Sequence, residues 1–176
     1  MFIKRGMKRV MSLPAQYFRA GVGAVIFNSM GLILALERAD IPAAAWQLPQ
    51  GGLDIDEAPL GGALREIAEE TGINKSDLEL LDSFPEPLAY ELPASAHSEK
   101  TGRGQVQYWF LFRFKGSDDS INLEAGGEFN AWNWIRFQDL LNAVVDFRKT
   151  VYRKLAVRFE PYISRSSAAN TSNKGV

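Results

Sequence analysis

Cysteine is absent from this chain of 176 residues, and histidine occurs only once, as His97. Without cysteine the protein has no disulfide, no thiolate metal site and no cysteine nucleophile. A single histidine also rules out a metal site built from several imidazoles. Any metal ion must therefore be bound by oxygen atoms, which favours a hard cation such as Mg²⁺ or Mn²⁺.

A large excess of charge and a long apolar segment are also missing. The formal net charge is −1, which argues against a general nucleic-acid-binding surface and leaves a local basic patch open. No apolar run is long enough to span a membrane, and the basic N-terminus lacks the continuous apolar stretch of a signal peptide. The sequence therefore predicts a cytoplasmic protein that has no membrane partner.

The chain has the composition of a globular protein, with 46% hydrophobic and 23% charged residues, and the length of a single domain. We expect a flexible N-terminal arm over residues 1–16, one domain over residues 17–163 and a disordered tail over residues 164–176. The tail is rich in small polar residues. The sequence leaves both a monomer and a homodimer open.

Apolar periodicity predicts a mixed α/β domain. The expected strands cover residues 18–28, 32–37, 46–48, 78–84, 87–92, 105–114 and 129–135. The expected helices cover residues 59–71, 137–143 and 148–158. Asp56 is the expected N-cap of the first helix, Pro59 suits its first turn, and Gly72 is its expected C-terminal glycine cap. This order predicts helices packed on the faces of the sheet.

The predicted helix over residues 59–71 carries two different stripes. The stripe that would pack on the sheet consists of Leu60, Ala63, Leu64, Ile67 and Thr71. Glu66, Glu69 and Glu70 form the neighbouring stripe, where like charges at i, i+3 and i+4 spacing repel by a few tenths of a kcal/mol per pair. Divalent cations would offset this repulsion, and the preceding loop, with Gln50 and Gly51, can bring a backbone carbonyl to the same ions. A solvated acidic face is the ordinary alternative.

The spacing around this helix resembles the Nudix box in full. Gly51 is followed after five residues by Glu57, and after seven more by the run Arg65-Glu66-Ile67-Ala68-Glu69-Glu70-Thr71-Gly72-Ile73. The chain is therefore similar to the Nudix hydrolases. The resemblance implies an α/β/α sandwich with a mixed β-sheet, and hydrolysis of a diphosphate by attack of a metal-activated water on phosphorus.

The same resemblance implies roles for individual side chains. The implied metal carboxylates are Glu66, Glu69 and Glu70 of the box, joined by Glu128 from a distant loop. The implied catalytic residues are Glu66, Glu70 and Glu128, with Glu66 or a residue outside the box as the base. Glu57 and Arg65 would pair and brace the loop against the helix, which is a structural role.

Segments outside the box resemble one branch of the family, which contains diadenosine tetraphosphate hydrolases and bacterial RNA 5′-pyrophosphohydrolases. The segments that carry this resemblance are WQLPQGG at residues 46–52, GQVQYWFLFRF at 104–114, GEFNAWNWI at 127–135 and FRKTVYRKLA at 147–156. The residues expected to contact the substrate are Arg38, Gln47, Gln50, Tyr90, Gln107 and Lys149.

The leading prediction is a Mg²⁺-dependent (or Mn²⁺-dependent) pyrophosphohydrolase of dinucleoside polyphosphates such as diadenosine tetraphosphate. The nearest alternative is an RNA 5′-pyrophosphohydrolase, whose partner would be an RNA 5′ end rather than a small nucleotide. An alternative of another class is a catalytically inactive Nudix-like module that only binds nucleotides. Such modules usually lose carboxylates of the box, whereas this box is complete.

Overall fold

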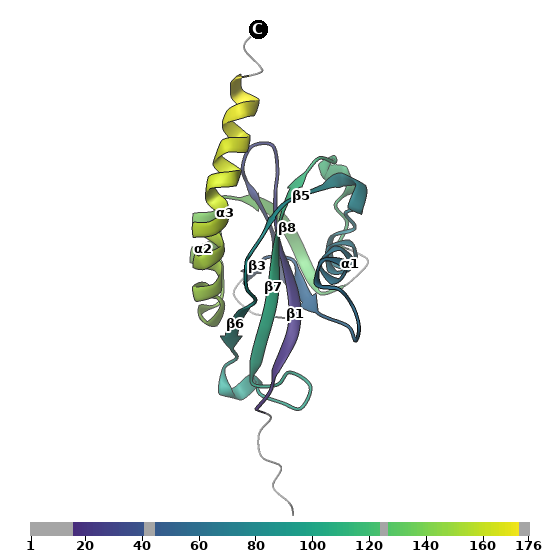
Figure 1. Cartoon of the computed structure of the whole chain (residues 1–176), viewed down its shortest axis with the longest axis vertical. Coiled ribbons are helices and arrows are strands. Elements are labelled where there is room, and N and C mark those ends of the chain that lie inside the picture. Colours follow the sequence, from purple (N-terminus) through teal and green to yellow (C-terminus); the bar gives the residue numbers. More distant parts are fainter. Residues whose placement is uncertain (1–15, 41–44, 124–126, 173–176) are drawn as a thin grey trace, which may run out of the picture.

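The computed structural model describes residues 16–40, 45–123 and 127–172 (Figure 1). Its strands are β1 (Phe18–Phe27), β2 (Ile33–Arg38), β3 (Trp46–Gln47), β4 (Gln50–Gly52), β5 (Leu78–Ser83), β6 (Leu88–Glu91), β7 (Gly104–Phe114) and β8 (Phe129–Ile135). Its α-helices are α1 (Pro59–Thr71), α2 (Phe137–Ala143) and α3 (Asp146–Ser172). The expected elements are therefore present, with ends that differ by a few residues except in α3.

The strands form one mixed sheet, in which β3, β2, β1, β7 and β5 lie in that order. Strand β4 pairs with β1, β6 with β7, and β8 with β2. The pairing of β1 with β7 is parallel, and the other pairs are antiparallel. The parallel register places Arg19 beside Gln105, two residues that the sequence alone does not connect.

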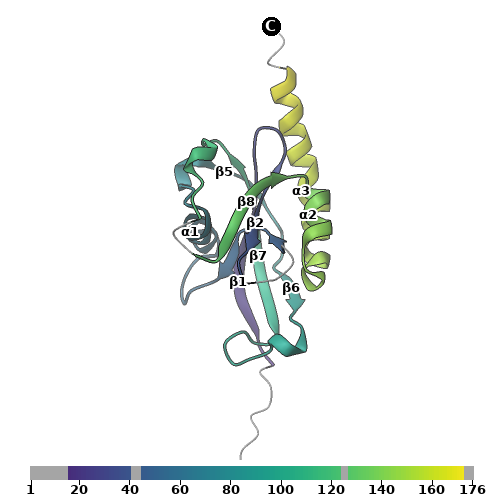
Figure 2. The same ribbon diagram turned by 180° about the vertical axis from the view of Figure 1, so that it is seen from behind.

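Helices cover both faces of this sheet (Figures 1 and 2). On the α1 face, Ile67 packs in a buried cluster with Ile26 and Phe112. On the opposite face, α2 and α3 contribute Leu140 and Leu155 to a second buried cluster. The predicted α/β/α sandwich is confirmed, since each helix buries an apolar stripe against one face of the sheet.

Helix α1 ends as predicted but begins differently. Gly72 has a φ of 70°, and its N–H donates to the carbonyl of Ala68, so the glycine cap is confirmed. The predicted N-cap is wrong, because Ala58 occupies that position and Asp56 has a φ of 61°. Proline disfavours helical conformation in the residue before it, so Pro59 keeps Ala58 extended and fixes the first helical residue.

Two adjacent glycines in α1 have different surroundings. Gly61 is exposed, and a Cβ built on it would have nothing within 4 Å. A Cβ on Gly62 would lie 2.9 Å from Leu53 Cδ1 and 2.9 Å from Glu57 Oε2, so here the loop approaches the helix closely.

We expect Gly61→Ala to raise the free energy of unfolding by about 0.5–1 kcal/mol, because alanine is the better helix former. Gly62→Ala serves as the matched variant and should lower the free energy of unfolding, because the added methyl group displaces Leu53 or Glu57. Thermal unfolding followed by circular dichroism measures both changes. Equal destabilisation of both variants would show that the close approach of Leu53 and Glu57 to Gly62 does not determine the effect of an added methyl group.

Helix α3 is longer than predicted. It begins at Asp146 and continues past Pro161 to Ser172, whereas the predicted helix covered residues 148–158. The predicted disorder of residues 164–176 stays a prediction. Adding residues to an existing helix costs little compared with starting one, which lets a polar sequence remain helical. Residues 173–176 of that tail, and residues 1–15 of the predicted arm, lie outside the described chain. None of the described helices is both long and apolar enough to cross a membrane.

Candidate active site

An open cavity of about 600 Å³ lies where the loop before α1, the sheet and the start of α3 come together. Its lining is dominated by carboxylates, guanidinium groups and backbone of β4. The lining residues are Arg19, Arg38, Gln50, Gly51, Gly52, Glu66, Glu69, Glu70, Gln105, Glu128, Phe129 and Arg148. Every residue predicted to bind metal therefore lines one cavity, together with Arg38 from the predicted substrate contacts.

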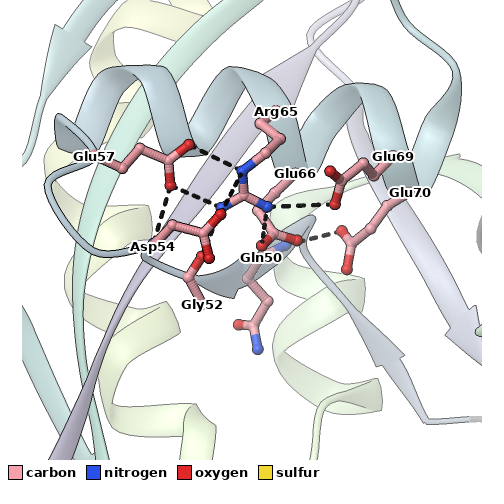
Figure 3. Close-up of polar contacts among 8 residues, drawn as sticks. All are labelled: Gln50, Gly52, Asp54, Glu57, Arg65, Glu66, Glu69 and Glu70. Atoms are coloured by element: carbon pink, nitrogen blue, oxygen red, sulfur yellow. Dashed lines mark hydrogen bonds and ion pairs between the residues drawn. The ribbon is translucent and has the colours of Figure 1, made fainter.

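Glu70 is the deeply buried carboxylate of this cavity, with only 8% of its surface exposed. The backbone N–H of Gln50 donates to Glu70 Oε2 at 3.0 Å, which joins β4 to α1 (Figure 3). Burial raises the pKa of Glu70 well above its ordinary value, and this hydrogen bond only partly opposes the shift. A positive charge that entered the cavity would therefore stabilise Glu70 in its ionised form.

Arg65 ties the acidic stripe to the preceding loop (Figure 3). Its guanidinium forms a bidentate pair with Glu57, at 2.9 Å and 2.8 Å, and donates to the carbonyl of Gly52 at 2.9 Å. Its Nη1 also donates to Glu66 at 2.9 Å and to Glu69 at 3.3 Å. The predicted pairing of Glu57 with Arg65 is present, and the same cation offsets the repulsion between Glu66 and Glu69.

We expect Arg65→Ala to lower the melting temperature at pH 7 by about 5 °C, because two partly buried carboxylates, those of Glu57 and Glu66, lose their partner. The bond from Arg65 lowers the pKa of Glu57 from 4.5 to about 2. The stabilisation from this pair is therefore complete above pH 4.5 and is lost as the pH falls toward about 2. The difference in melting temperature between wild type and variant should narrow over that window.

Arg136→Ala is the matched control, because Arg136 forms a bidentate pair with Asp139 at 2.7 Å and 2.9 Å on an exposed surface. Exposed pairs contribute little to stability, so the control should melt close to wild type. Equal destabilisation by the two substitutions would show that Arg65 is no more than a surface charge.

Glu128 reaches the cavity because β8 pairs with β2, which aligns Phe129 with Arg38. The N–H of Ala39 donates to the backbone carbonyl of Glu128 at 2.9 Å, and the Glu128 carboxylate lies 3.7 Å from Arg38 Nη1. Arg38 also forms two hydrogen bonds of 2.7 Å with Asp40, and these bonds raise the pKa of Arg38. A cation and an anion thus face each other at one edge of the cavity.

Four predicted substrate residues do not line the cavity. Gln47, Tyr90 and Gln107 are buried, with exposed fractions of 2%, 5% and 0%. The ring of Tyr90 packs against Phe147, with centroids 5.6 Å apart, and the guanidinium of Arg148 covers it at 5.7 Å. Lys149 pairs with Asp146 at 2.7 Å. Direct contact of these four residues with the substrate stays a prediction.

The structure places Arg148 in the cavity rather than Lys149. Arg148 precedes the buried residues Val151, Tyr152 and Leu155 by three, four and seven positions, so it lies on the same face of α3. This spacing is a signal that could have identified Arg148 from the sequence. Arg148 also donates to Gln47 Oε1, which connects α3 with β3.

Helix α3 holds the loop between β3 and β4. The hydroxyl of Tyr152, which is fully buried, accepts a hydrogen bond of 2.9 Å from the N–H of Leu48. Leu48 precedes Gln50 and Gly51, which line the cavity. A Cβ on Gly51 would lie 2.0 Å from Glu66 Cδ, so only glycine leaves room for the carboxylate at this point.

The side chains suit a hard divalent cation. Within the described ranges, no three histidine, aspartate or glutamate side chains form a ready-made metal site. The cavity nevertheless gathers four carboxylates, and burial raises the pKa of both Glu66 and Glu70. In addition, Gln50 Oε1 is buried without a hydrogen-bond partner among the described residues. Oxygen donors whose charge or polarity is left uncompensated are the ligands that Mg²⁺ and Mn²⁺ take.

Comparison with known proteins identifies relatives along most of the chain. The NUDIX domain model matches residues 17–155. The RNA pyrophosphohydrolase of Cereibacter sphaeroides is 38% identical over 162 residues, which cover 90% of this chain and 100% of that protein. The RNA pyrophosphohydrolase of Acidiphilium cryptum is 40% identical over 158 residues, covering 86% and 95%. The crystal structure of a C. elegans Ap4A hydrolase binary complex has a TM-score of 0.62 and 22% identity, covering 81% of this chain and 98% of that one, a likeness of fold.

Proposed function

The chain belongs to the Nudix family, and we propose that it is a divalent-cation-dependent pyrophosphohydrolase of nucleoside 5′-polyphosphates. The observation that carries this proposal is one cavity in which four carboxylates face three guanidinium groups. Carboxylates bind hard divalent cations, and guanidinium groups bind phosphate oxygens. A polyphosphate bound together with its cations requires both kinds of group, side by side.

Glu66, Glu69, Glu70 and Glu128 would hold Mg²⁺ or Mn²⁺. When bound, this cation would neutralise charge on the phosphate oxygens and make a water easier to deprotonate. Glu66 suits the role of general base, because burial raises the pKa of its carboxylate and so makes it a better proton acceptor. Its carboxylate lies against Gly51, where the missing side chain leaves space.

Arg19, Arg38 and Arg148 would bind and orient the phosphate chain. Arg38 is held by Asp40 through two hydrogen bonds of 2.7 Å, and Arg148 lies over Tyr90 and Phe147 at 5.7 Å and 5.5 Å. Side chains that are already oriented lose little freedom when they bind a ligand. The anchored arginines therefore favour a substrate with several adjacent phosphates.

A dinucleoside polyphosphate is the first candidate substrate. Water attack on diadenosine tetraphosphate would break one phosphoanhydride bond and release ATP and AMP. The flanks of the box resemble the branch that contains both candidate activities, so they do not separate the two. A net charge of −1 favours the dinucleotide, because it gives little general attraction for a long phosphate backbone.

The triphosphorylated 5′ end of an RNA is the second candidate. Hydrolysis would leave a 5′-monophosphate on the RNA and release pyrophosphate. Relatives at 38% and 40% identity, both matched over most of their length, are named RNA pyrophosphohydrolases. These names favour the RNA end more directly than the 22% likeness to an Ap4A hydrolase favours the dinucleotide.

A product assay with Mg²⁺ tests the proposal and separates the two candidates. Diadenosine tetraphosphate, a 5′-triphosphorylated oligoribonucleotide and ADP-ribose are compared at equal concentration, and kcat/KM is measured for each. We expect one of the first two to be hydrolysed fastest. Fastest turnover of ADP-ribose would contradict the assignment, and nucleotide binding without turnover in any divalent cation would instead support an inactive binding module.

A further inference from the structure

Gln105 is a residue of the cavity wall to which neither the Nudix box nor the predicted substrate contacts assign a role. It lies on β7 beside Arg19 and lines the cavity. Its side-chain carbonyl Oε1 accepts two hydrogen bonds, from the hydroxyl of Tyr90 at 2.8 Å and from Gln107 Nε2 at 3.0 Å. A carbonyl oxygen has two lone pairs, so both acceptor positions of Gln105 are occupied.

The two donors sit in a buried layer behind the cavity. Tyr90 is 5% exposed and Gln107 is fully buried, and both lie on strands that pair with each other. With Oε1 held from behind, the amide NH₂ of Gln105 is the end that remains for the cavity. The described part of the chain provides no hydrogen-bond partner for that NH₂ group.

We infer that Gln105 is a substrate-positioning residue, whose side-chain NH₂ donates a hydrogen bond to a polyphosphate oxygen and whose orientation is fixed by Tyr90 and Gln107. This inference rests on the proposed function, since it assumes a polyphosphate in the cavity. A donor held in place before binding needs no reorientation when the anion arrives. Gln105 would thus add a neutral donor to Arg19 and Arg148, which line the same cavity.

The inference also gives Tyr90 a role that fits its surroundings. Its ring contacts Phe147 and Arg148, and only 5% of its surface is exposed, so it offers no free face for stacking a nucleobase. Its hydroxyl acts instead on Gln105. Tyr90 is therefore a positioning residue that acts through a neighbour, rather than a residue that touches the substrate.

Gln105→Glu is the sharpest test, because it preserves the shape of the side chain and keeps an oxygen for Tyr90 and Gln107. It replaces only the NH₂ group by a negatively charged oxygen. We expect KM for the substrate hydrolysed by wild type to rise at least about tenfold, with kcat within about threefold and an unchanged melting temperature. Gln138→Glu, which adds the same charge at an exposed position of α2 outside this cavity, is the matched control and should leave KM unchanged.

Inorganic tripolyphosphate, used as a competitive inhibitor, shows which part of the substrate is contacted. Its inhibition constant should rise in Gln105→Glu by the same factor as KM. A raised KM with an unchanged inhibition constant would mean a contact with the nucleoside and would overturn the inference. An unchanged KM in an active Gln105→Glu enzyme overturns it as well, whereas a wild-type enzyme inactive on every polyphosphate refutes the proposed function itself.

Tyr90→Phe in two backgrounds tests the orienting role. In the wild-type background the lost hydroxyl lets the Gln105 amide turn, so KM should rise a few-fold. In the Gln105→Glu background both terminal atoms are oxygen and orientation no longer matters, so Tyr90→Phe should add nothing. An equal effect in both backgrounds would show that Tyr90 acts on the substrate directly, against the inference.

Discussion

Glu70→Gln is expected to lower kcat by roughly 10²–10³-fold while the fold stays intact, because an anionic group of the cavity is lost and its shape is kept. The Gln50 N–H can still donate to the side-chain oxygen of glutamine, as it does to Glu70 Oε2 at 3.0 Å. Turnover at saturating Mg²⁺ and the circular dichroism spectrum are the two measurements. Near-normal turnover would exclude Glu70 from the metal site.

The same substitution should raise thermal stability when divalent cations are removed with EDTA. Burial raises the pKa of Glu70 from 4.5, so the folded state favours the protonated form. The contribution of Glu70 to stability is therefore complete below pH 4.5 and is lost as the pH rises through the raised pKa. Glutamine does not ionise, so the melting temperature of Glu70→Gln should exceed that of wild type increasingly as the pH rises.

Glu86→Gln is the control for this pH dependence, because Glu86 is an exposed glutamate outside the cavity. Its melting temperature should follow that of wild type at every pH. A constant difference between Glu70→Gln and wild type from pH 5 to pH 8 would mean that ionisation of Glu70 costs no stability. Addition of Mg²⁺ should reverse the order of the two melting temperatures, because only wild type keeps the full set of ligands.

Glu128→Ala is expected to lower kcat about a hundredfold with little change in KM. The Glu128 side chain is 60% exposed, yet it lines the cavity and lies 3.7 Å from Arg38. We propose that Glu128 joins the carboxylates of α1, because cations bound with a polyphosphate take more oxygen ligands than one face of a helix supplies. We therefore expect the Glu128 carboxylate to stabilise mainly the transition state, in which charge develops at phosphorus, so its loss should appear in kcat.

The kinetics of Glu128→Ala separate two roles of this residue. If its main effect were to hold Arg38, the loss would appear in KM, because Arg38 is proposed to bind phosphate in the ground state as well. Glu86→Ala serves as the control for removal of an exposed glutamate. Wild-type kcat in Glu128→Ala would show that the carboxylates of α1 suffice.

The gathering of the α1 glutamates in one cavity could be predicted because their relation to one another is local. Glu66, Glu69 and Glu70 lie on one helix, and helical geometry alone brings residues three and four apart to the same side. The pairing of Glu57 with Arg65 is also local, since it joins the helix to the loop just before it. The strands, and the packing of helices on the faces of the sheet, followed from apolar periodicity, which reports the buried side of each element. The α/β/α sandwich was implied by the resemblance to the Nudix family.

Which side chains from the rest of the chain line the cavity was decided only by the tertiary structure. The parallel register of β1 and β7 sets Arg19 beside Gln105, and packing of α3 on the sheet turns Arg148 into the cavity. The same packing buries Tyr90 under Arg148, although a tyrosine in a strand can equally face solvent. Sequence by itself determined the chemistry of α1, because a helix fixes near neighbours. The cations and the neutral donor that would meet the substrate come from strands and helices far apart in the chain, and only their pairing and packing decide which side chains face the cavity.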